Sequence, residues 1–432
     1  MALLLGAGVL LTFRLRGIQF RLLGYALRLA FSRERSGKGD VSHFGALMTA
    51  LAATVGVGNI AGVSTAVALG GPGAVFWMWI TALFGMATKY AEAYLAVRFR
   101  RVNDRGEISG GPMHYLEIGL GQKWLAVCFA LFGSLAAFGI GNMVQANTTA
   151  EAINGVLGTN KYLVGIALAS FTAMVILGGI KRIAEVASFF VPVMVLVYFA
   201  GAVWVILANA SLLPAGFSMI MENAFTGTAA AGGFAGAAFS QTMRYGIARG
   251  LFSNESGLGS APIAAAAART NQPAKQALVS MTGTFLDTIV ICSLTGLVLA
   301  STGAWTSGET GVALTALAFS KGLPGDWGQW LVAGGIVTFA FSTILGWSYY
   351  GEKCFEYLAG TRYVAHYRYA WIVLVFAGSV AKLELVWNFS DVMNALMAVP
   401  NLIGLFFLSG LLARETKDFE KGIGDGSIEK FD

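Results

Sequence analysis

Charged residues are scarce in this sequence of 432 residues, since Asp, Glu, Lys and Arg together make up only 12% of it. Soluble globular proteins carry about 25%, so the composition excludes an ordinary soluble enzyme. Hydrophobic residues make up 56%, and they come in long blocks separated by short polar segments. This pattern is typical of a protein that crosses a membrane many times.

Cysteine and histidine are also rare, with three residues of each. The cysteines lie far apart in or beside apolar blocks, without a CxxC motif or a neighbouring histidine, which argues against a zinc or dithiol site. The histidines lie at the ends of blocks or in loops and lack the spacing of a metal site or of a Ser/His/Asp nucleophile. We therefore expect no enzymatic activity and no organic cofactor.

Eleven apolar segments, found in windows of about 19 residues, predict an all-α polytopic membrane protein with eleven transmembrane helices. They lie near 1–13, 44–68, 74–97, 124–154, 162–179, 184–208, 235–266, 276–300, 328–351, 368–385 and 392–412. The first stands apart, and the other ten form two sets of five. Because five is odd, the two sets run in opposite orientations, which predicts an inverted repeat.

This division predicts four parts of the chain. Residues 1–42 hold the N-terminal helix and a basic amphipathic segment, 43–210 the first five-helix repeat, 211–413 the second, and 414–432 a cytoplasmic tail. Within the first part, residues 17–32 alternate basic and apolar side chains at helical spacing. This favours a helix along the inner membrane surface over a plain connector.

The net charge of +6 is distributed unevenly along the predicted arrangement. Only Lys161, Lys321 and Lys382 fall in outer loops, whereas most of the 29 Lys and Arg residues fall on the inner side. Cytoplasmic loops of membrane proteins carry such an excess, so we expect the C-terminus in the cytoplasm. Anionic lipid accounts for the basic residues, so the expected partner is the lipid bilayer, and neither nucleic acid nor an obligatory protein partner is indicated.

Two glycine pairs interrupt the second and seventh apolar segments. The second reads Gly56-Val57-Gly58-Asn59, and the seventh reads Gly257-Leu258-Gly259-Ser260, 201 residues later. Glycines let a helix unwind, and the backbone groups that this frees must face a ligand or a cavity. Paired interrupted helices are typical of secondary transporters, in which half-helix ends hold substrate and cation.

Polar side chains inside the apolar segments mark the candidate site, because they are costly in a bilayer unless they line a wet site. At the break of the seventh segment, Ser253 and Asn254 suit a zwitterion or Na+. Glu255 could offset a cation or a substrate amine, or it could pair with Arg249. Gln145 and Asp287 have similar alternatives: a ligand contact or, for each, a structural contact with a neighbouring helix.

The same region predicts a Na+ site built from oxygen atoms. Before the first break, Ala52, Ala53, Thr54 and Val55 end a half-helix and present carbonyl groups, and Asn59 starts the next half. The ninth segment supplies Thr338, Ser342, Thr343 and Trp347, in pairs one turn apart. Hard oxygen ligands suit Na+ better than soft metals. Alternatively, each Ser or Thr hydroxyl bonds a carbonyl of its own helix and does not bind Na+.

Four motifs carry a resemblance to a known family: TVGVGNIAGV (54–63), GGPGAVFWMW (70–79), SGGPMHYLE (109–117) and FSNESGLGSAP (252–262). The chain resembles the sodium:alanine symporter family, also called alanine or glycine:cation symporters, over about 1–414. The resemblance implies a LeuT-type fold of ten core helices plus one N-terminal helix, in a bacterial or archaeal inner membrane.

The resemblance also implies which residues bind. Substrate contacts are expected at Thr54, Gly56, Asn59, Gln145, Phe252, Ser253, Thr343 and Trp347. The Na+ site is expected at the Ala52 and Val55 carbonyls with Ser342 and Thr343, while Asn254, Glu255, Asp287 and Thr338 are secondary candidates. Na+ is then the coupling ion.

The working hypothesis is import of a small neutral amino acid, alanine or glycine, with Na+ by alternating access. The second, third, seventh and eighth segments would rock against the rest. The alternatives are a proton-coupled carrier, in which Glu255 or Asp287 titrates, and an amino-acid exchanger. A channel or an intramembrane hydrolase is disfavoured, because neither a symmetric filter nor a nucleophile with its base is visible.

Overall fold

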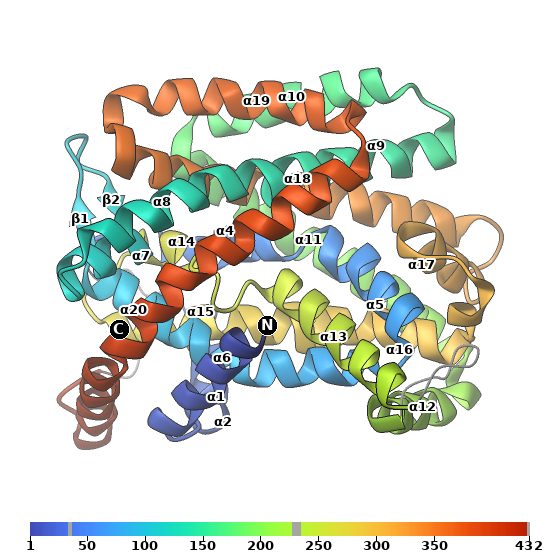
Figure 1. Cartoon of the computed structure of the whole chain (residues 1–432), viewed down its shortest axis with the longest axis horizontal. Coiled ribbons are helices and arrows are strands. Elements are labelled where there is room, and N and C mark those ends of the chain that lie inside the picture. The colour runs from blue at the N-terminus through green and yellow to red at the C-terminus, as the bar shows by residue number, and fades with distance from the viewer. Residues whose placement is uncertain (33–36, 227–234, 430–432) are drawn as a thin grey trace.

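The protein is described here by a computed structural model, which covers residues 1–32, 37–226 and 235–429. Almost all of this part is helical, and a two-stranded antiparallel hairpin, β1 (Arg101–Val102) and β2 (Ile108–Ser109), is its only sheet. In Figure 1, α10 and α19 form the upper edge of the bundle, and α20 runs diagonally across it toward the C-terminus. The structure is thus mostly helical, as the sequence predicted.

The first half of the chain contains α1 (Ala2–Arg14), α2 (Ile18–Arg21), α3 (Leu23–Ala30), α4 (His43–Thr54), η1 (Gly58–Gly62), α5 (Val63–Gly70), α6 (Ala74–Arg98), α7 (Pro112–His114), η2 (Tyr115–Gly119), α8 (Lys123–Phe138), η3 (Gly139–Met143), α9 (Val144–Leu157), α10 (Lys161–Ile176) and α11 (Gly179–Ala208). Residues 17–32 form two short helices, α2 and α3, where the sequence predicted one. Leu22, between them, lies outside both helices.

The second half contains η4 (Ala210–Leu212), α12 (Leu213–Thr226), α13 (Ala235–Asn254), α14 (Pro262–Ala266), α15 (Pro273–Thr284), η5 (Phe285–Cys292), α16 (Ser293–Thr302), η6 (Ala304–Ser307), α17 (Gly311–Ser320), α18 (Trp327–Ala359), η7 (Thr361–Tyr363), α19 (Val364–Val380) and α20 (Leu383–Asp425). The last helix continues beyond residue 413, so most of the predicted tail is helical.

Among the described residues, five helices are long and apolar enough to cross a membrane, and the bent pair α4 and α5 adds a sixth span. The total of eleven spans therefore stays a prediction. Helices α6 and α15 pack together, as do α8 and α18, and α10 and α19. Each pair joins corresponding members of the two predicted sets, which is what an inverted repeat would produce; the repeat itself also stays a prediction.

Both predicted helix breaks are confirmed. The second apolar segment bends by 52° between α4 and the helical turns that start at Gly58. The seventh leaves its helix after Asn254 and becomes helical again at Pro262. Between these points Gly257 and Gly259 have φ values of 89° and 81°, which glycine adopts without the penalty that a side chain would bring. Glu255 in the same stretch also has a positive φ, of 56°, so the glycine pair contributes to the turn together with Glu255.

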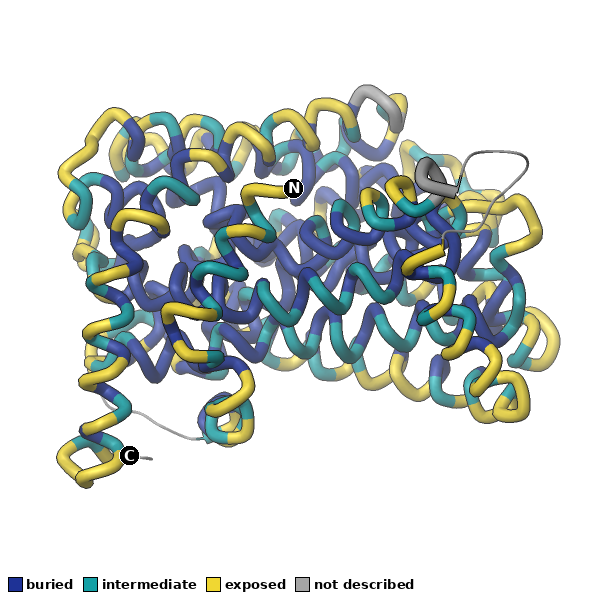
Figure 2. Tube along the Cα trace, turned by 60° about the horizontal axis from the view of Figure 1, so that its bottom comes forward, coloured by how far each residue is buried: buried dark blue, intermediate teal, exposed yellow. Residues whose placement is uncertain are grey.

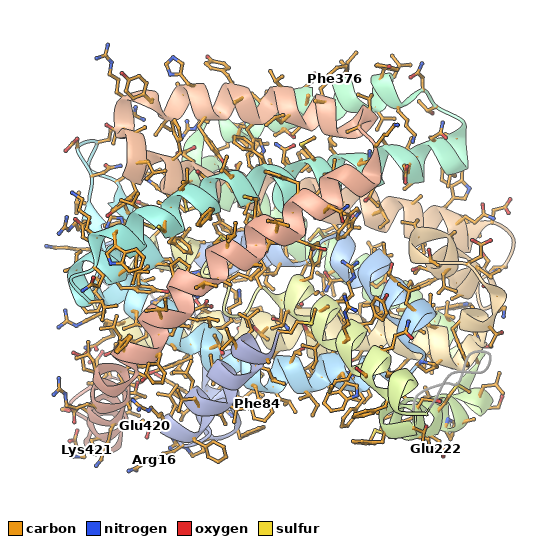
Figure 3. All side chains as sticks on the ribbon, viewed as in Figure 1. Arg16, Phe84, Glu222, Phe376, Glu420 and Lys421 are labelled. Atoms are coloured by element: carbon orange, nitrogen blue, oxygen red, sulfur yellow. The ribbon has the colours of Figure 1, made fainter. Side chains whose placement is uncertain are left out.

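The surface of the bundle is apolar, and its charge gathers at the ends. Large hydrophobic side chains such as Phe189, Val373 and Phe407 are exposed, whereas the centre of the bundle is buried (Figure 2). Figure 3 shows Arg16 and Glu420 at the same corner of the molecule, near the C-terminal end of α20. An apolar exterior around a packed core that contains polar groups is what a lipid environment requires.

Candidate substrate and cation site

A small cavity of about 10 Å³ lies between the two helix breaks. Its walls are Ala53, Thr54, Gly56, Gly58, Ile140, Gln145, Phe252, Ser253, Glu255, Thr343 and Trp347. Seven of the eight predicted substrate contacts are in this set, and Asn59 is the exception. A cavity of this size holds about one water molecule. An amino acid therefore needs the walls to move apart before it can bind in this cavity.

Asn59 points away from the cavity and stabilises the first break. Its amide nitrogen donates to a carboxylate oxygen of Asp287 at 2.7 Å, and its amide oxygen accepts the backbone N–H of Gly56 at 2.9 Å. In an uninterrupted helix that N–H would donate to the carbonyl of Ala52, four residues earlier. The Asn59 side chain thus leaves the Ala52 carbonyl without its usual donor, which suits it to bind a cation.

Three of the four predicted cation ligands, Val55, Ser342 and Thr343, meet beside the cavity. The hydroxyls of Ser342 and Thr343 lie 3.4 and 3.5 Å from the carbonyl oxygen of Val55. Ser342 also donates to the carbonyl of Phe339 at 2.8 Å. The candidate ligand atoms are all neutral oxygens, which suit a hard monovalent cation.

Thr338 does not belong to this group of oxygens. Its hydroxyl donates to the carbonyl of Gly334 at 2.8 Å, so it bonds its own helix. Thr54, in contrast, lines the cavity although its hydroxyl also bonds its own helix, at the carbonyl of Ala50. The structure therefore does not place Thr338, a secondary candidate, among the cation ligands.

Glu255 lies in the cavity wall and anchors an aromatic residue of the opposite wall. One carboxylate oxygen accepts the indole N–H of Trp347 at 2.7 Å, and the other accepts the hydroxyl of Ser260, also at 2.7 Å. The suggested pairing of Glu255 with Arg249 is absent from the described ion pairs. The Arg249 guanidinium instead lies 4.8 Å from the ring centre of Trp387.

Asp287 lies behind the cavity, where it gathers side chains from both breaks. Besides Asn59, it accepts hydrogen bonds from Ser253 at 2.9 Å and from Thr288 at 2.7 Å. Asn254 is directed to the same place, since its amide donates to Thr288 at 3.3 Å, and it does not line the cavity. Asp287 and Asn254 are therefore placed to hold the breaks in position.

The sequence reasoning missed a buried charge next to this site. Lys89 in α6 is 3% exposed, and its ammonium has no hydrogen-bond partner among the described residues. It interacts electrostatically with Glu255, Glu92 and Asp287. The sequence could have indicated this charge, because two ionisable residues, Lys89 and Glu92, fall inside the third apolar segment. Such residues rarely lie in a membrane without a role.

Helical irregularity is a second feature that the sequence reasoning missed. Three π-helical segments, η1, η3 and η5, lie at or beside the cavity. The first two contribute Gly58 and Ile140 to the cavity wall, and η5 contains Asp287, which lies behind it. A π-helical turn frees or shifts backbone groups and is frequent at functional sites. No residue pattern in the sequence distinguishes these turns from ordinary helix.

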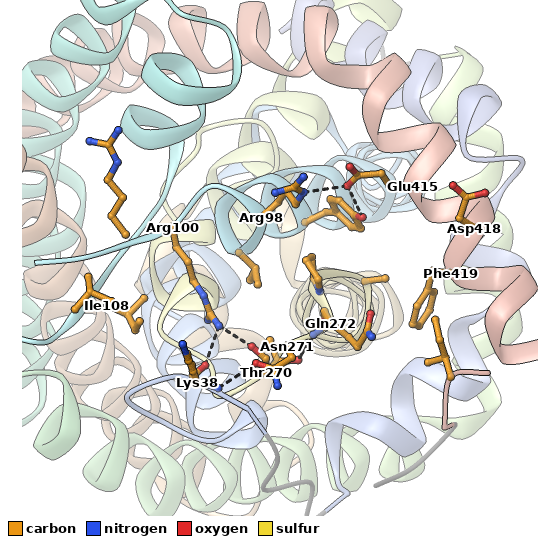
Figure 4. Close-up of a pocket in the computed structure, with 17 residues that line it drawn as sticks. Lys38, Arg98, Arg100, Ile108, Thr270, Asn271, Gln272, Glu415, Asp418 and Phe419 are labelled. Carbon is orange, nitrogen blue, oxygen red and sulfur yellow. Dashed lines mark hydrogen bonds and ion pairs between the residues drawn. The ribbon is translucent and has the colours of Figure 1, made fainter. Parts of the chain in front are cut away.

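At the end of the molecule that holds the C-terminus, Arg100 joins two segments of the chain. Its guanidinium donates to four backbone carbonyls, those of Ala266, Ala268, Lys38 and Thr270, at 2.6 to 2.8 Å. It thereby joins the segment before α4 to the segment after α14. Figure 4 shows Arg100 reaching toward Lys38 and Thr270 at one side of a cavity of about 680 Å³ at this end.

The opposite end, which the sequence predicts to face outward, contains a larger cavity, which we call the outer vestibule. It measures about 800 Å³ and is lined by residues that include Val57, Arg249, Glu309 and Trp387. Its inner end approaches the central cavity, because Val57 lies between two residues of the central cavity wall, Gly56 and Gly58. The two ends of the molecule therefore differ: Arg100 joins two segments at one end, and a cavity approaches the central cavity from the other.

Comparison with known proteins identifies the family. The chain matches the model of the sodium:alanine symporter family over residues 1–432. The chain belongs to the sodium:alanine symporter family. It is 53% identical to the sodium/alanine symporter AgcS of Methanococcus maripaludis, over 98% of this chain and 94% of that protein. It is 39% identical to the probable sodium/glutamine symporter GlnT of Bacillus subtilis, over 97% of this chain and 87% of that protein.

Solved structures show which fold the sodium:alanine symporter family member adopts. A substrate-bound, outward-open Na+-coupled sialic acid symporter matches it with a TM-score of 0.55 and 14% identity, over 91% of this chain and 86% of that one. The shared fold is that of LeuT-like Na+-coupled transporters. The chain is thus an integral membrane transporter of a Na+-coupled amino-acid symporter family and not an enzyme, as the sequence predicted.

Proposed function

We propose that this transporter imports alanine or glycine together with Na+ by alternating access. We further propose that it lies in the cytoplasmic membrane of a bacterium or archaeon, with its C-terminus in the cytoplasm. The observation that carries the proposal is the contact between the substrate cavity and the cation ligands. Thr343 belongs to both, since it lines the cavity and its hydroxyl lies 3.5 Å from the Val55 carbonyl oxygen.

The dimensions of the cavity support a small substrate. A methyl group placed on Gly56 would come within 2.5 Å of the Thr343 hydroxyl, and one on Gly58 would come within 3.2 Å of the Phe252 ring. Trp347 closes another side, where its hydrogen bond to Glu255 fixes the indole. Expansion of this cavity has to move packed aromatic rings, so each added methylene of the substrate is costly. Alanine and glycine demand the least expansion.

Na+ binding supports closure around the substrate. The Val55 and Ala52 carbonyls belong to the broken helix, while Ser342 and Thr343 belong to α18. A cation between them attracts oxygens from both elements and thereby draws the broken helix toward α18. When Na+ leaves, these neutral oxygens lose their shared partner, and the two elements can separate.

The unequal ends support alternating access. In this conformation the Arg100 hydrogen bonds join two segments at the end near the C-terminus, whereas the outer vestibule reaches Trp387, whose ring centre lies 5.1 Å from that of Phe252 in the central cavity wall. The barrier on the outer side is thus only about one pair of rings thick. Inward release requires the Arg100 hydrogen bonds to break while the outer side closes, as rocking of α4–α6 and α13–α16 against α8–α10, α18 and α19 would accomplish.

Uptake of radiolabelled alanine into proteoliposomes tests the proposal. An inward Na+ gradient is compared with an equal choline gradient, and unlabelled glycine and leucine serve as competitors. We expect uptake only with Na+, inhibition by glycine and none by leucine. Uptake that follows a pH gradient without Na+ would favour a proton-coupled carrier, and uptake that requires internal amino acid would favour an exchanger. Equal inhibition by leucine would contradict the small cavity.

A further inference from the structure

The outer vestibule contains a cation that no described side chain neutralises at close range. Arg249 takes part in none of the ion pairs between described residues. Its guanidinium is held by aromatic faces instead, 4.8 Å from the ring centre of Trp387 and 5.7 Å from that of Phe252. The carboxylate of Asp391 acts on it only at longer range. No hydrogen bond or ion pair between described residues uses the N–H donors of Arg249, which lines both the vestibule and a neighbouring cavity that contains Asp391.

We propose that Arg249 forms an outer subsite that binds the carboxylate of the amino-acid substrate before it reaches the central cavity. This inference rests on the proposed function. Planar guanidinium groups bind carboxylates through two parallel hydrogen bonds. Stacking on two rings keeps the guanidinium in one orientation, which reduces the entropy lost when a carboxylate binds.

Negative charge elsewhere in the vestibule favours an amino acid over a simple anion. Glu309 and Glu151 line the same cavity as Arg249. Glu151 is paired with Lys161 at 3.3 Å, whereas no ion pair between described residues includes Glu309. In a cavity that holds charges of both signs, the carboxylate of a zwitterion is attracted by Arg249, and its ammonium group is attracted by the negative charge of Glu309. A chloride ion gains only the first attraction and is repelled by the second group.

The place of Arg249 in the chain connects this subsite to transport. It lies three residues, and so about one turn, before Phe252 in α13. Phe252 lines the central cavity and also stacks on Trp387 at the inner end of the vestibule. A substrate held at Arg249 is therefore separated from the central cavity by the Phe252 ring, whose movement would admit it.

Initial rates of Na+-driven alanine uptake test the subsite. The variant Arg249→Met should raise KM for alanine about tenfold, the effect expected from losing a charged hydrogen-bond pair, with kcat within twofold of wild type. Glu309→Gln should raise KM less. The matched control is Arg244→Met, which removes a cation from the same helix outside the vestibule and should leave KM unchanged. An unchanged KM for Arg249→Met, or a loss of kcat alone, would overturn the proposal.

A second variant covers the case in which Arg249→Met does not fold. Arg249→Cys is treated with 2-aminoethyl methanethiosulfonate, which adds a positive charge, or with methyl methanethiosulfonate, which does not. Only the first reagent should restore a low KM, and the unsubstituted chain, which retains half-buried Cys128, should respond to neither. Restoration by both reagents, or by neither, would overturn the subsite.

Replacement of chloride tests whether Arg249 binds an amino-acid carboxylate or an inorganic anion. Uptake by the wild type shows whether a negative result concerns this inference or the proposed function. Replacing chloride with gluconate should leave wild-type KM unchanged, whereas a strict need for chloride would assign Arg249 to an inorganic anion and overturn the subsite. If wild-type vesicles show no Na+-dependent alanine uptake, the proposed function fails. If they show it and Arg249→Met matches them, only the outer subsite fails.

Discussion

Removal of the two hydroxyls on α18 should weaken Na+ binding while the protein stays folded. Ser342 and Thr343 lie 3.4 and 3.5 Å from the Val55 carbonyl oxygen, and both are buried. A hydrogen-bonding or ligand contact with a charged group contributes about 1.5–3 kcal/mol. Loss of one hydroxyl should therefore lower Na+ affinity at least about tenfold, since 1.4 kcal/mol corresponds to a factor of ten.

The assay is the dependence of alanine uptake on Na+ concentration in proteoliposomes. We expect the half-saturating Na+ concentration to rise at least about tenfold in Ser342→Ala and in Thr343→Ala, and further in the double variant. Thr343→Ala should also raise KM for alanine, because Thr343 lines the substrate cavity and Ser342 does not. This difference separates the cation ligand from the residue shared by both ligands.

The matched control is Thr338→Ala, which removes a hydroxyl from the same helix. That hydroxyl donates to the carbonyl of Gly334 at 2.8 Å and contacts none of the proposed cation ligands. Its removal should leave the Na+ dependence unchanged. Wild-type Na+ dependence in the double variant Ser342→Ala/Thr343→Ala, or an equally strong shift in Thr338→Ala, would exclude these two hydroxyls as the cation ligands.

Three further predictions concern the cavity and the folded state. Gly56→Ala places a methyl group 2.5 Å from the Thr343 hydroxyl, so alanine uptake should be lost while size-exclusion chromatography shows a monodisperse protein; wild-type uptake would contradict it. Trp347→Phe removes the N–H that donates to Glu255 at 2.7 Å, so kcat/KM for alanine should fall about tenfold, and unchanged initial rates would contradict this role. Burial lowers the pKa of His114 to about 4, so the unfolded chain binds more protons between about pH 4 and 6.5 and the free energy of unfolding should decrease as pH falls through that window, by at most about 1.4 kcal/mol per pH unit. His114→Gln should flatten the dependence of Tm on pH there, and an unaltered slope would exclude His114 as its cause.

The helix breaks were predictable because their cause is local. Gly257 and Gly259 adopt positive φ values that other residues avoid, so this pair marks its break without knowledge of the fold, whereas Gly56 and Gly58 are not among the glycines with positive φ. The cavity walls were largely predictable for a related reason, since polar side chains such as Gln145 are costly at membrane depth unless they are used.

Side-chain direction was not predictable to the same degree. Asn59 was expected to contact substrate, but it bonds Asp287 and the Gly56 backbone, because the break brings both within its reach. From the sequence, each hydroxyl of α18 was an equally good candidate cation ligand. Only the packing of the helices shows that Ser342 faces the Val55 carbonyl whereas Thr338 bonds its own helix. Long-range contacts of this kind depend on how helices are arranged in space, which residue spacing alone does not define.

The central claim, that Na+ drives the amino acid through this chain, is tested most directly by the limiting accumulation ratio of alanine in proteoliposomes. With about 100 mV across the membrane (about 2.3 kcal/mol per charge) and a tenfold Na+ gradient (about 1.4 kcal/mol), one Na+ per cycle provides about 3.7 kcal/mol, which permits roughly 500-fold accumulation. We expect concentrative uptake bounded by this value and a smaller accumulation ratio when either gradient is removed. Alanine that stops at equal internal and external concentrations while both gradients persist would contradict it.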